Sequence, residues 1–221
     1  MDFDFGRLAE EYVKREPRER KPHSYYASEI PWCLRKVYYS HTARREFPID
    51  KLLLFKAGDQ AHWFVRSVLK WAGLLVDAER SISIVDPETD VEIRGRLDDV
   101  LVMETGEGQA VVEVKSVARY GLKYISGPKD PHVMQITPYV RVVSARLGYL
   151  VYLERDSYAS KTFRVDYDPA VLKAALARAV EVDRCIERGE PPVAEARATP
   201  GREFECKQCL YSDLCSLEEE P

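Results

Sequence analysis

The chain has 221 residues and a formal net charge of −4, with 45% hydrophobic and 32% charged residues, which is the composition of a soluble globular protein. This length buries one substantial core with room for a small appended lobe. No apolar run reaches the ~18 residues of a membrane span and the start is acidic, so we expect a cytoplasmic protein without membrane contact. The net negative charge argues against a protein that coats nucleic acid with its whole surface. A polyanion would have to bind in a local basic groove.

Two further features of the composition bear on source and chemistry. Asparagine is absent, glutamine is scarce and charged residues are plentiful, which is typical of thermophile proteins. The chain also contains five cysteines. In a protein of intracellular character, cysteines indicate metal binding rather than disulfides.

In chain order, the first half of the sequence predicts three helices and then extended segments. An amphipathic helix is expected over residues 3–15. Ser28 is expected to cap a short helix that carries Cys33 and ends near Tyr39. A longer helix is expected from Leu52 to Gly73, with His62 on it.

The second half is expected to begin with a hairpin. An extended segment over residues 74–85 and a turn at 86–90 lead to a strand from Val91 to Met103. The glycines of residues 105–109 are typical of a hairpin turn before the next strand, Ala110 to Val117. The remaining expected elements are a helix from His132 to about Arg146, strands at 148–153 and 161–167, a helix over 170–188 that Asp168 caps, and a linker at 191–201. This order predicts an α/β fold, with one mixed sheet flanked by helices.

The predicted hairpin gathers charged side chains. Because side chains alternate along a strand, Glu113 and Lys115 share one face. Pairing of the two strands brings Asp98 near them, whereas Asp99 points to the other side. Two acids and a lysine on half-buried strands are costly unless something binds them, which favours a divalent metal. The alternative is a solvated strand face with a surface ion pair.

The cysteines suggest a second metal site. Cys206, Cys209 and Cys215 are closely spaced, and the distant Cys33 completes a set of four thiolates. Zinc and iron–sulfur clusters both accept four thiolates, although a zinc ribbon normally brings two C-x-x-C pairs and this chain has one. Cys185 lies in a predicted helix without cysteine neighbours, so we interpret it as structural.

The motifs Gly58-x-x-x-His62, Gly95-x-x-Asp98, Glu113-x-Lys115 and Gln135-x-x-x-Tyr139 occur in the order found in RecB-like nucleases of the PD-(D/E)XK superfamily. With one cysteine before this series and three after it, the chain resembles the CRISPR-associated Cas4 exonuclease family over residues 24–217. The resemblance implies a restriction-endonuclease-like α/β core. It also implies an iron–sulfur clamp that joins the two terminal segments. The segments are then 1–50, which is helical and contributes Cys33, the nuclease core 51–190, and the cysteine segment 191–221.

The resemblance also implies roles for individual residues. A catalytic Mn²⁺ or Mg²⁺ is expected on His62, Asp98, Glu113 and the carbonyl of Val114, with Lys115 orienting the attacking water. Gln135 and Tyr139 are expected to contact substrate or steady the site. The cysteines Cys33, Cys206, Cys209 and Cys215 are expected to hold an iron–sulfur cluster, most often [4Fe-4S], with [2Fe-2S] possible. Basic and aromatic residues at 119–129 are expected to contact single-stranded DNA.

The sequence therefore predicts a metal-dependent DNA exonuclease that acts on single-stranded DNA or ends. By resemblance, it trims prespacers in CRISPR adaptation alongside integrase proteins. The alternatives are a repair or recombination nuclease of the same fold, a non-catalytic DNA-binding scaffold with a four-cysteine zinc site, and a redox protein. A G-x-x-x-x-G-K-[ST] phosphate loop is absent, so the chain is not its own ATP-driven helicase.

Overall fold

The computed structural model describes residues 4–14, 20–43, 45–103 and 108–217, so residues 105–107 of the predicted hairpin turn lie outside the described residues. The elements in chain order are α1 (Phe5–Lys14), β1 (Ser24–Tyr26), α2 (Leu34–Thr42), α3 (Ile49–Trp71), β2 (Leu75–Ala78), β3 (Ser81–Val85), β4 (Glu92–Arg96), β5 (Asp99–Val102), β6 (Gln109–Val117), the 3₁₀ turn η1 (Gly121–Tyr124), α4 (Asp130–Val142), β7 (Leu147–Glu154), β8 (Ser160–Asp166), α5 (Pro169–Arg188), α6 (Glu195–Ala198), α7 (Glu203–Lys207) and α8 (Ser212–Leu217). No helix within these residues is long and apolar enough to cross a membrane.

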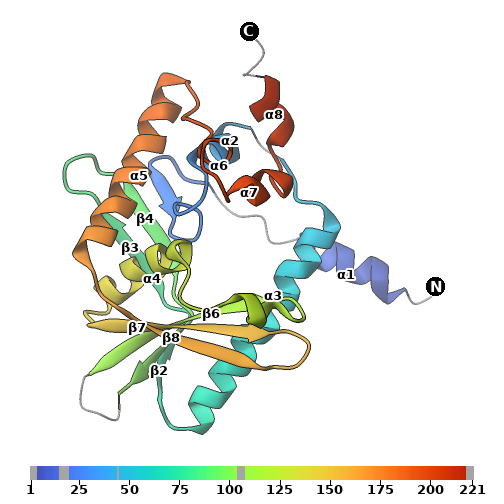
Figure 1. Cartoon of the computed structure of the whole chain (residues 1–221), viewed down its shortest axis with the longest axis vertical. Coiled ribbons are helices and arrows are strands. Elements are labelled where there is room, and N and C mark those ends of the chain that lie inside the picture. The colour runs from blue at the N-terminus through green and yellow to red at the C-terminus, as the bar shows by residue number, and fades with distance from the viewer. Residues whose placement is uncertain (1–3, 15–19, 44, 104–107, 218–221) are drawn as a thin grey trace.

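The strands form two mixed sheets, whereas the element order predicts one (Figure 1). The smaller sheet has the order β1-β4-β3, with β1 parallel to β4. The larger sheet has the order β2-β5-β6-β7-β8, in which β6 and β7 are parallel and the other neighbours antiparallel. The α/β class is confirmed, and the prediction of a single sheet is wrong.

The second sheet arises from a bend in the predicted strand over residues 91–103. This segment is two strands, because the chain leaves the smaller sheet after β4 and enters the larger one at β5. The facing segment over residues 74–85 breaks at the same level, where Glu79 has a φ of 54°. The amide of Glu79 donates to the carbonyl of Asp98 (2.9 Å), so backbone pairing continues across the bend. Leu97 is fully buried there, which fixes where the strand changes sheets.

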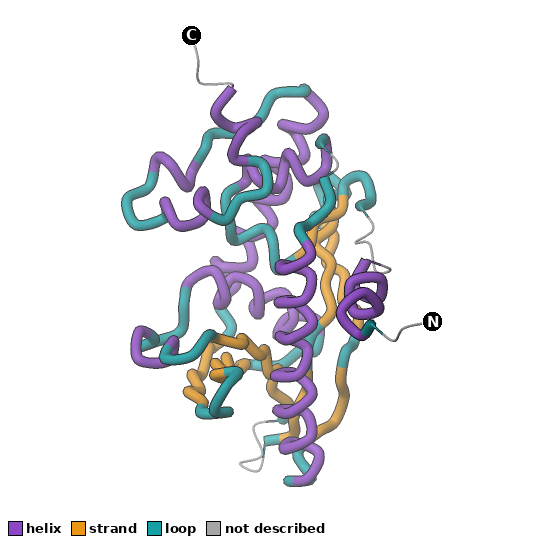
Figure 2. Tube along the Cα trace, turned by 90° about the vertical axis from the view of Figure 1, so that its right-hand side faces the viewer, coloured by secondary structure: helices purple, strands orange, loops and turns teal. Residues whose placement is uncertain are grey.

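Helices cover both faces of the larger sheet, and alternation along β6 decides what each helix meets. Figure 2 shows the long helix α3 running beside the strands. On this face Ala61 and Val65 of α3 pack with Val112 and Val114 of β6. The opposite face is covered by α4, whose Ile136 and Val140 belong to a cluster with Val111 and Leu150.

The segment before α2 differs from its prediction. Ser28 does not cap a helix that carries Cys33; α2 begins at Leu34, directly after Cys33. The preceding residues are held instead by Arg178 of α5, which donates hydrogen bonds to the carbonyls of Ile30 (2.9 Å) and Trp32 (2.7 Å). These carbonyls therefore have a distant side chain as partner and do not need a helical ladder.

Two other elements differ from their predicted bounds for identifiable reasons. Helix α4 ends at Val142 rather than near Arg146, because Ser144 adopts a φ of 55° before β7 begins. The predicted linker at 191–201 contains α6, whose Ala196 is buried. The predicted cap of α5 is confirmed, since the Asp168 side chain accepts a hydrogen bond from the amide of Ala170 (2.7 Å).

Candidate functional site

Asp98 lies between β4 and β5, at the place where the strand changes sheets. Strand β5 pairs with β6 only from Asp99 opposite Val112 onward, so the next stretch of β6 lacks a strand neighbour on this side. The Asp98 carboxylate takes that place, because its Oδ2 accepts a hydrogen bond from the amide of Val114 (2.7 Å). This bond fixes the carboxylate beside β6, although Asp98 is not itself a strand residue as the alternation argument assumed.

His62 reaches Asp98 from α3. Its Nδ1 lies 2.9 Å from Asp98 Oδ1. Packing of the neighbouring Ala61 onto the sheet holds this turn of α3 against β6. Burial lowers the pKa of His62, but the hydrogen bond to Asp98 and the charges of Asp98 and Glu113 outweigh it, so the pKa is raised above its ordinary value.

Glu113 is buried on the α4 face of β6. Its Oε1 accepts hydrogen bonds from Lys115 Nζ (2.7 Å) and Gln135 Nε2 (2.6 Å). Gln135 in turn accepts from Lys115 Nζ through its own Oε1 (2.7 Å). Burial, followed by repulsion from Asp98, raises the pKa of Glu113 to about 7. Glu113, Lys115 and Gln135 thus form a closed hydrogen-bonded set in a buried place.

The second oxygen of Glu113, Oε2, is buried and has no hydrogen-bond partner among the described residues. An unpaired buried carboxylate oxygen is costly, and a cation would relieve that cost. The two carboxylates suit Mn²⁺ or Mg²⁺, and the imidazole favours Mn²⁺ of the two. In the described part of the chain, the ligand atoms of His62, Asp98 and Glu113 do not all lie within 4.8 Å of one another. The group that meets this distance lies elsewhere. The residues fit the predicted metal by chemistry and by the unpaired oxygen.

Of two motif glycines, Gly95 allows close packing, whereas a Cβ at Gly58 would make an ordinary contact. A Cβ at Gly95 would lie 2.6 Å from the hydroxyl oxygen of Tyr139, so the ring of Tyr139 occupies the space that a side chain would need. A Cβ at Gly58 would lie 3.4 Å from Ser116 Oγ. Tyr139 is 2% exposed. Tyr139 therefore packs against Gly95 and does not meet solvent.

Arg66 is a residue of this site that the sequence reasoning missed. It lies four residues after His62 on α3, donates from Nε to Asp99 Oδ1 (2.7 Å) and from Nη2 to the Asp98 carbonyl (3.1 Å). Asp99 is fully buried, so this ion pair anchors the strand just beyond Asp98. The only sequence signal was the i, i+4 spacing from His62, which places both side chains on one helix face.

The four predicted cluster cysteines line one pocket between α2 and the C-terminal helices α6 to α8. The amide of Tyr211 donates to Cys209 Sγ (3.4 Å), and Arg35 Nη1 lies 3.8 Å from Cys215 Sγ. Two more basic residues, Lys36 and Arg197, lie in the lining of the pocket. The full lining is Cys33, Arg35, Lys36, Tyr39, Ala194, Ala196, Arg197, Glu205, Cys206, Cys209, Tyr211, Ser212 and Cys215. N–H···S contacts and nearby positive charge suit a thiolate cluster, which carries net negative charge. Cys185 is buried in α5 outside this pocket.

The predicted DNA-contacting stretch forms an exposed aromatic and basic surface around η1. Tyr120 is 61% and Tyr124 78% exposed. Arg119 lies over the ring of Tyr120 (4.9 Å to its centroid), and Lys123 over that of Tyr124 (4.8 Å). This surface follows β6 directly in the chain, so it starts within a few residues of Lys115.

The fold is an α/β architecture that also occurs in solved exonuclease structures. The alkaline exonuclease LHK-Exo of Laribacter hongkongensis has a similar fold at 12% identity, with a TM-score of 0.52, over 76% of this chain and 89% of that one. The same protein in complex with dAMP is 14% identical, with a TM-score of 0.52, over 75% and 91% of the two chains. The crystal structure of SSO0001 is more similar, with a TM-score of 0.64 and 22% identity over 96% of both chains.

The sequence comparison is more specific than the fold. The chain is 26% identical over 220 residues to the CRISPR-associated exonuclease Cas4 of Saccharolobus solfataricus, and the match covers 97% of this chain and 96% of that protein. No protein-family model matches the chain. The resemblance to the Cas4 exonucleases that the motif series predicts is confirmed over 97% of the chain.

Proposed function

We propose that this protein is a metal-dependent DNA exonuclease. The observation that carries the proposal is the buried, unpaired Glu113 Oε2. Glu113 directly precedes Val114, whose amide binds the Asp98 carboxylate that meets His62. Lys115 and Gln135 both bond the other oxygen, Oε1, so Oε2 is left for a cation. The similarity to Cas4 and to an alkaline exonuclease supports a nuclease rather than a scaffold.

In this proposal His62, Asp98, Glu113 and the carbonyl of Val114 hold Mn²⁺ or Mg²⁺. A bound divalent ion supplies a water of lowered pKa and a positive charge for the phosphoryl oxygens. Gln135 holds Glu113 and Lys115 in register through its two amide atoms. Lys115 places its ammonium where negative charge develops as water attacks phosphorus.

The proposed substrate is single-stranded DNA or a DNA end. The exposed rings of Tyr120 and Tyr124, with Arg119 and Lys123 beside them, offer stacking and phosphate contacts that need no base sequence. They lie next in the chain to the strand that carries Lys115. A single DNA strand that passes over η1 would therefore reach the site from the side of these residues.

The four-cysteine pocket is proposed to hold an iron–sulfur cluster, [4Fe-4S] or [2Fe-2S], that joins the terminal segments. The setting is proposed to be CRISPR adaptation, in which the protein trims prespacers beside the integrase proteins. The support for this setting is the full-length similarity to Cas4. The main alternative is a repair or recombination nuclease with the same site.

The proposal is tested by removing the negative charge of Glu113 at constant shape. Glu113→Gln is expected to lower Mn²⁺-dependent digestion of labelled single-stranded DNA by at least about a hundredfold. Glu154→Gln is the matched control, because Glu154 is also a buried glutamate, on the neighbouring strand β7, with its carboxylate bonded to Ser157. Comparable cleavage by the two variants would reject the assignment of this site.

A further inference from the structure

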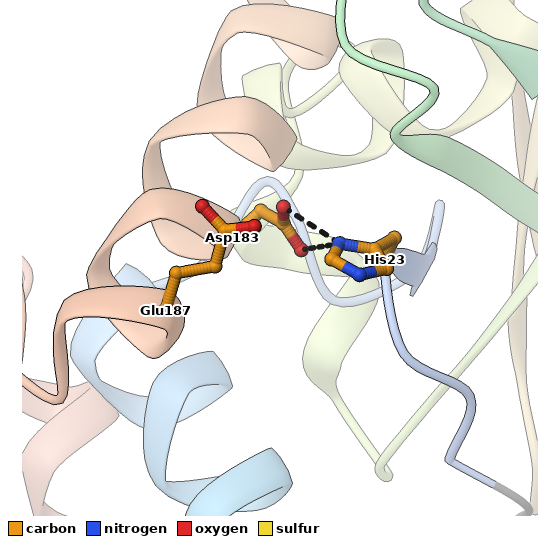
Figure 3. Close-up of side chains that lie close together, drawn as sticks. All are labelled: His23, Asp183 and Glu187. Carbon is orange, nitrogen blue, oxygen red and sulfur yellow. Dashed lines mark hydrogen bonds and ion pairs between the residues drawn. The ribbon is translucent and has the colours of Figure 1, made fainter.

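A second cluster of metal-ligating side chains lies outside both predicted sites. Asp183 and Glu187 are one turn apart on α5, and His23 stands immediately before β1 (Figure 3). One ligand atom from each of the three lies within 4.8 Å of the others. Spacing of four along a helix places both carboxylates on the same face.

The contacts show how the cluster is held. His23 Nδ1 lies 3.0 and 3.2 Å from the two carboxylate oxygens of Asp183. Asp183 is only 6% exposed, and its Oδ1 also accepts a hydrogen bond from the Tyr25 hydroxyl (2.6 Å). Tyr25 is itself buried, so Asp183 has a fixed orientation.

Glu187 does not take part in this bonding. It is exposed, and it makes no hydrogen bond or ion pair with the residues that the structure describes. Two carboxylates close together repel each other unless a cation lies between or beside them. The ion pair of Asp183 is with His23, whose pKa is raised by the hydrogen bond and the charge of Asp183, so a metal ion would take the place of the imidazole proton.

We propose that His23, Asp183 and Glu187 bind one divalent transition-metal ion, of which Zn²⁺ is the representative. One imidazole nitrogen with two carboxylate ligands is a set that Zn²⁺ accepts, with water in the remaining position. Magnesium and calcium favour ligands that are all oxygen, so the imidazole argues against them. Tyr25 acts as an outer partner that orients the carboxylate of Asp183.

The site has a structural effect and shares no residue with the proposed nuclease site or the cysteine pocket. The ion would join the segment entering β1 to α5, two parts of the chain that are 160 residues apart at His23 and Asp183. A ligand that binds only the folded state raises its stability. Failure of this site would leave the proposed function untouched.

The test compares Zn²⁺ binding by the whole protein, prepared anaerobically, with that of three variants. Glu187→Gln removes one exposed ligand, and His23→Asn removes the imidazole with a residue that tolerates the φ of 54° at this position. Glu181→Gln is the matched control, because Glu181 is an exposed glutamate of the same helix outside the cluster. Other Zn²⁺ sites are the same in all four proteins, so differences report this cluster.

Calorimetric titration with Zn²⁺ is expected to show one more bound ion in the wild type and Glu181→Gln than in the other two. At a free Zn²⁺ concentration about a hundredfold above Kd, the Tm should rise by roughly 5–10 °C in the first two proteins beyond any rise in the others. Equal stoichiometry and equal Tm shifts in all four proteins would overturn the proposal. If His23→Asn loses the extra Zn²⁺ ion and Glu187→Gln retains it fully, the three-residue site is overturned as well.

Discussion

At the scale of single residues, Lys115 is the side chain whose effect on cleavage can be separated by experiment from its effect on DNA binding. Its Nζ donates to both Glu113 and Gln135 at 2.7 Å, so it is fixed beside the proposed metal site without being a ligand. Such a charge stabilises the transition state more than the bound substrate.

Lys115→Ala is therefore expected to slow cleavage of single-stranded DNA by roughly a hundredfold to a thousandfold. Affinity for the DNA should change by only a few-fold, because Lys115 is one phosphate contact among several. The two quantities are measured by timed digestion and by fluorescence anisotropy on the same labelled strand. Near wild-type cleavage would show that the Glu-x-Lys strand is not the active site.

His132 provides a residue-scale prediction about pH. Its Nδ1 lies 2.9 Å from the Tyr152 hydroxyl, which accepts a hydrogen bond from the amide of Lys129 (3.0 Å). A neutral imidazole can accept a hydrogen bond from the Tyr152 hydroxyl at Nδ1, whereas a protonated one cannot. Burial, and then the charges of Lys115 and Lys129, lower the pKa of His132 to about 3.

Because the folded pKa is lowered, the unfolded chain binds this proton below its ordinary pKa of about 6.5 and the folded chain does not. The His132 contribution to stability is complete above pH 7 and is lost as pH falls from about 6.5 toward 3. Between pH 7 and pH 5 we expect a loss on the order of 1–2 kcal/mol. Urea unfolding at both pH values should show that His132→Gln loses less free energy of unfolding between pH 7 and pH 5 than the wild type does. An equal loss in the two proteins would contradict the assignment of this pH dependence to His132.

At the scale of elements, the N-terminus of α2 is capped by residues far along the chain. The amide of Cys33 donates to Glu205 (3.0 Å), and that of Leu34 to Glu195 (3.0 Å). Glu195 is also paired with Arg178, at 2.7 and 2.9 Å. Burial opposes ionisation of Glu195, but the bonds from Arg178 and Leu34 outweigh it and lower the pKa of this carboxyl.

Glu195→Ala is expected to destabilise the protein by about 1–3 kcal/mol, because it leaves the charge of Arg178 without its carboxylate partner and the Leu34 amide without an acceptor. The measurement is the free energy of unfolding in urea. Glu190→Ala is the control: Glu190 is exposed and lies 3.9 Å from Arg188, so its change should stay within about 0.5 kcal/mol. Equal effects would show that the capping contacts contribute nothing.

At the scale of the whole molecule, the segment around α2 lies against the C-terminal helices (Figure 1). Arg35 donates to the carbonyl of Pro192 (2.6 Å), and Arg45 forms an ion pair with Asp213 (2.6 Å). The four-cysteine pocket lies between these parts of the chain. A cluster there would fasten contacts that the protein already makes.

Serine at Cys33, Cys206, Cys209 or Cys215 is expected to remove the visible absorbance and the iron of anaerobically purified protein, and to lower its Tm. Cys185→Ser should keep both the colour and the iron, because Cys185 is buried in α5 and does not line the pocket. Iron analysis and absorption spectra check both statements. Zinc in place of iron and sulfide would reject the cluster.

The sequence by itself determined the features that local patterns encode. Helical periodicity predicted α3, and the Asp168-Pro169 pair predicted where α5 begins. Strand alternation predicted that Glu113 and Lys115 share a face, and the structure brings both to Gln135. The order of the motifs predicted the resemblance to Cas4, which the comparison confirms.

The tertiary structure alone decided what depends on partners distant in the chain. The bend at Leu97, which creates the second sheet and places Asp98 between two strands, follows from burial and cross-strand pairing. The capping of α2 by Glu195 and Glu205 and the anchoring of Asp99 by Arg66 have no local pattern either. Periodicity reports which face of an element is apolar, but a carboxylate finds its cation only when the chain folds, because such pairs depend on distance in space.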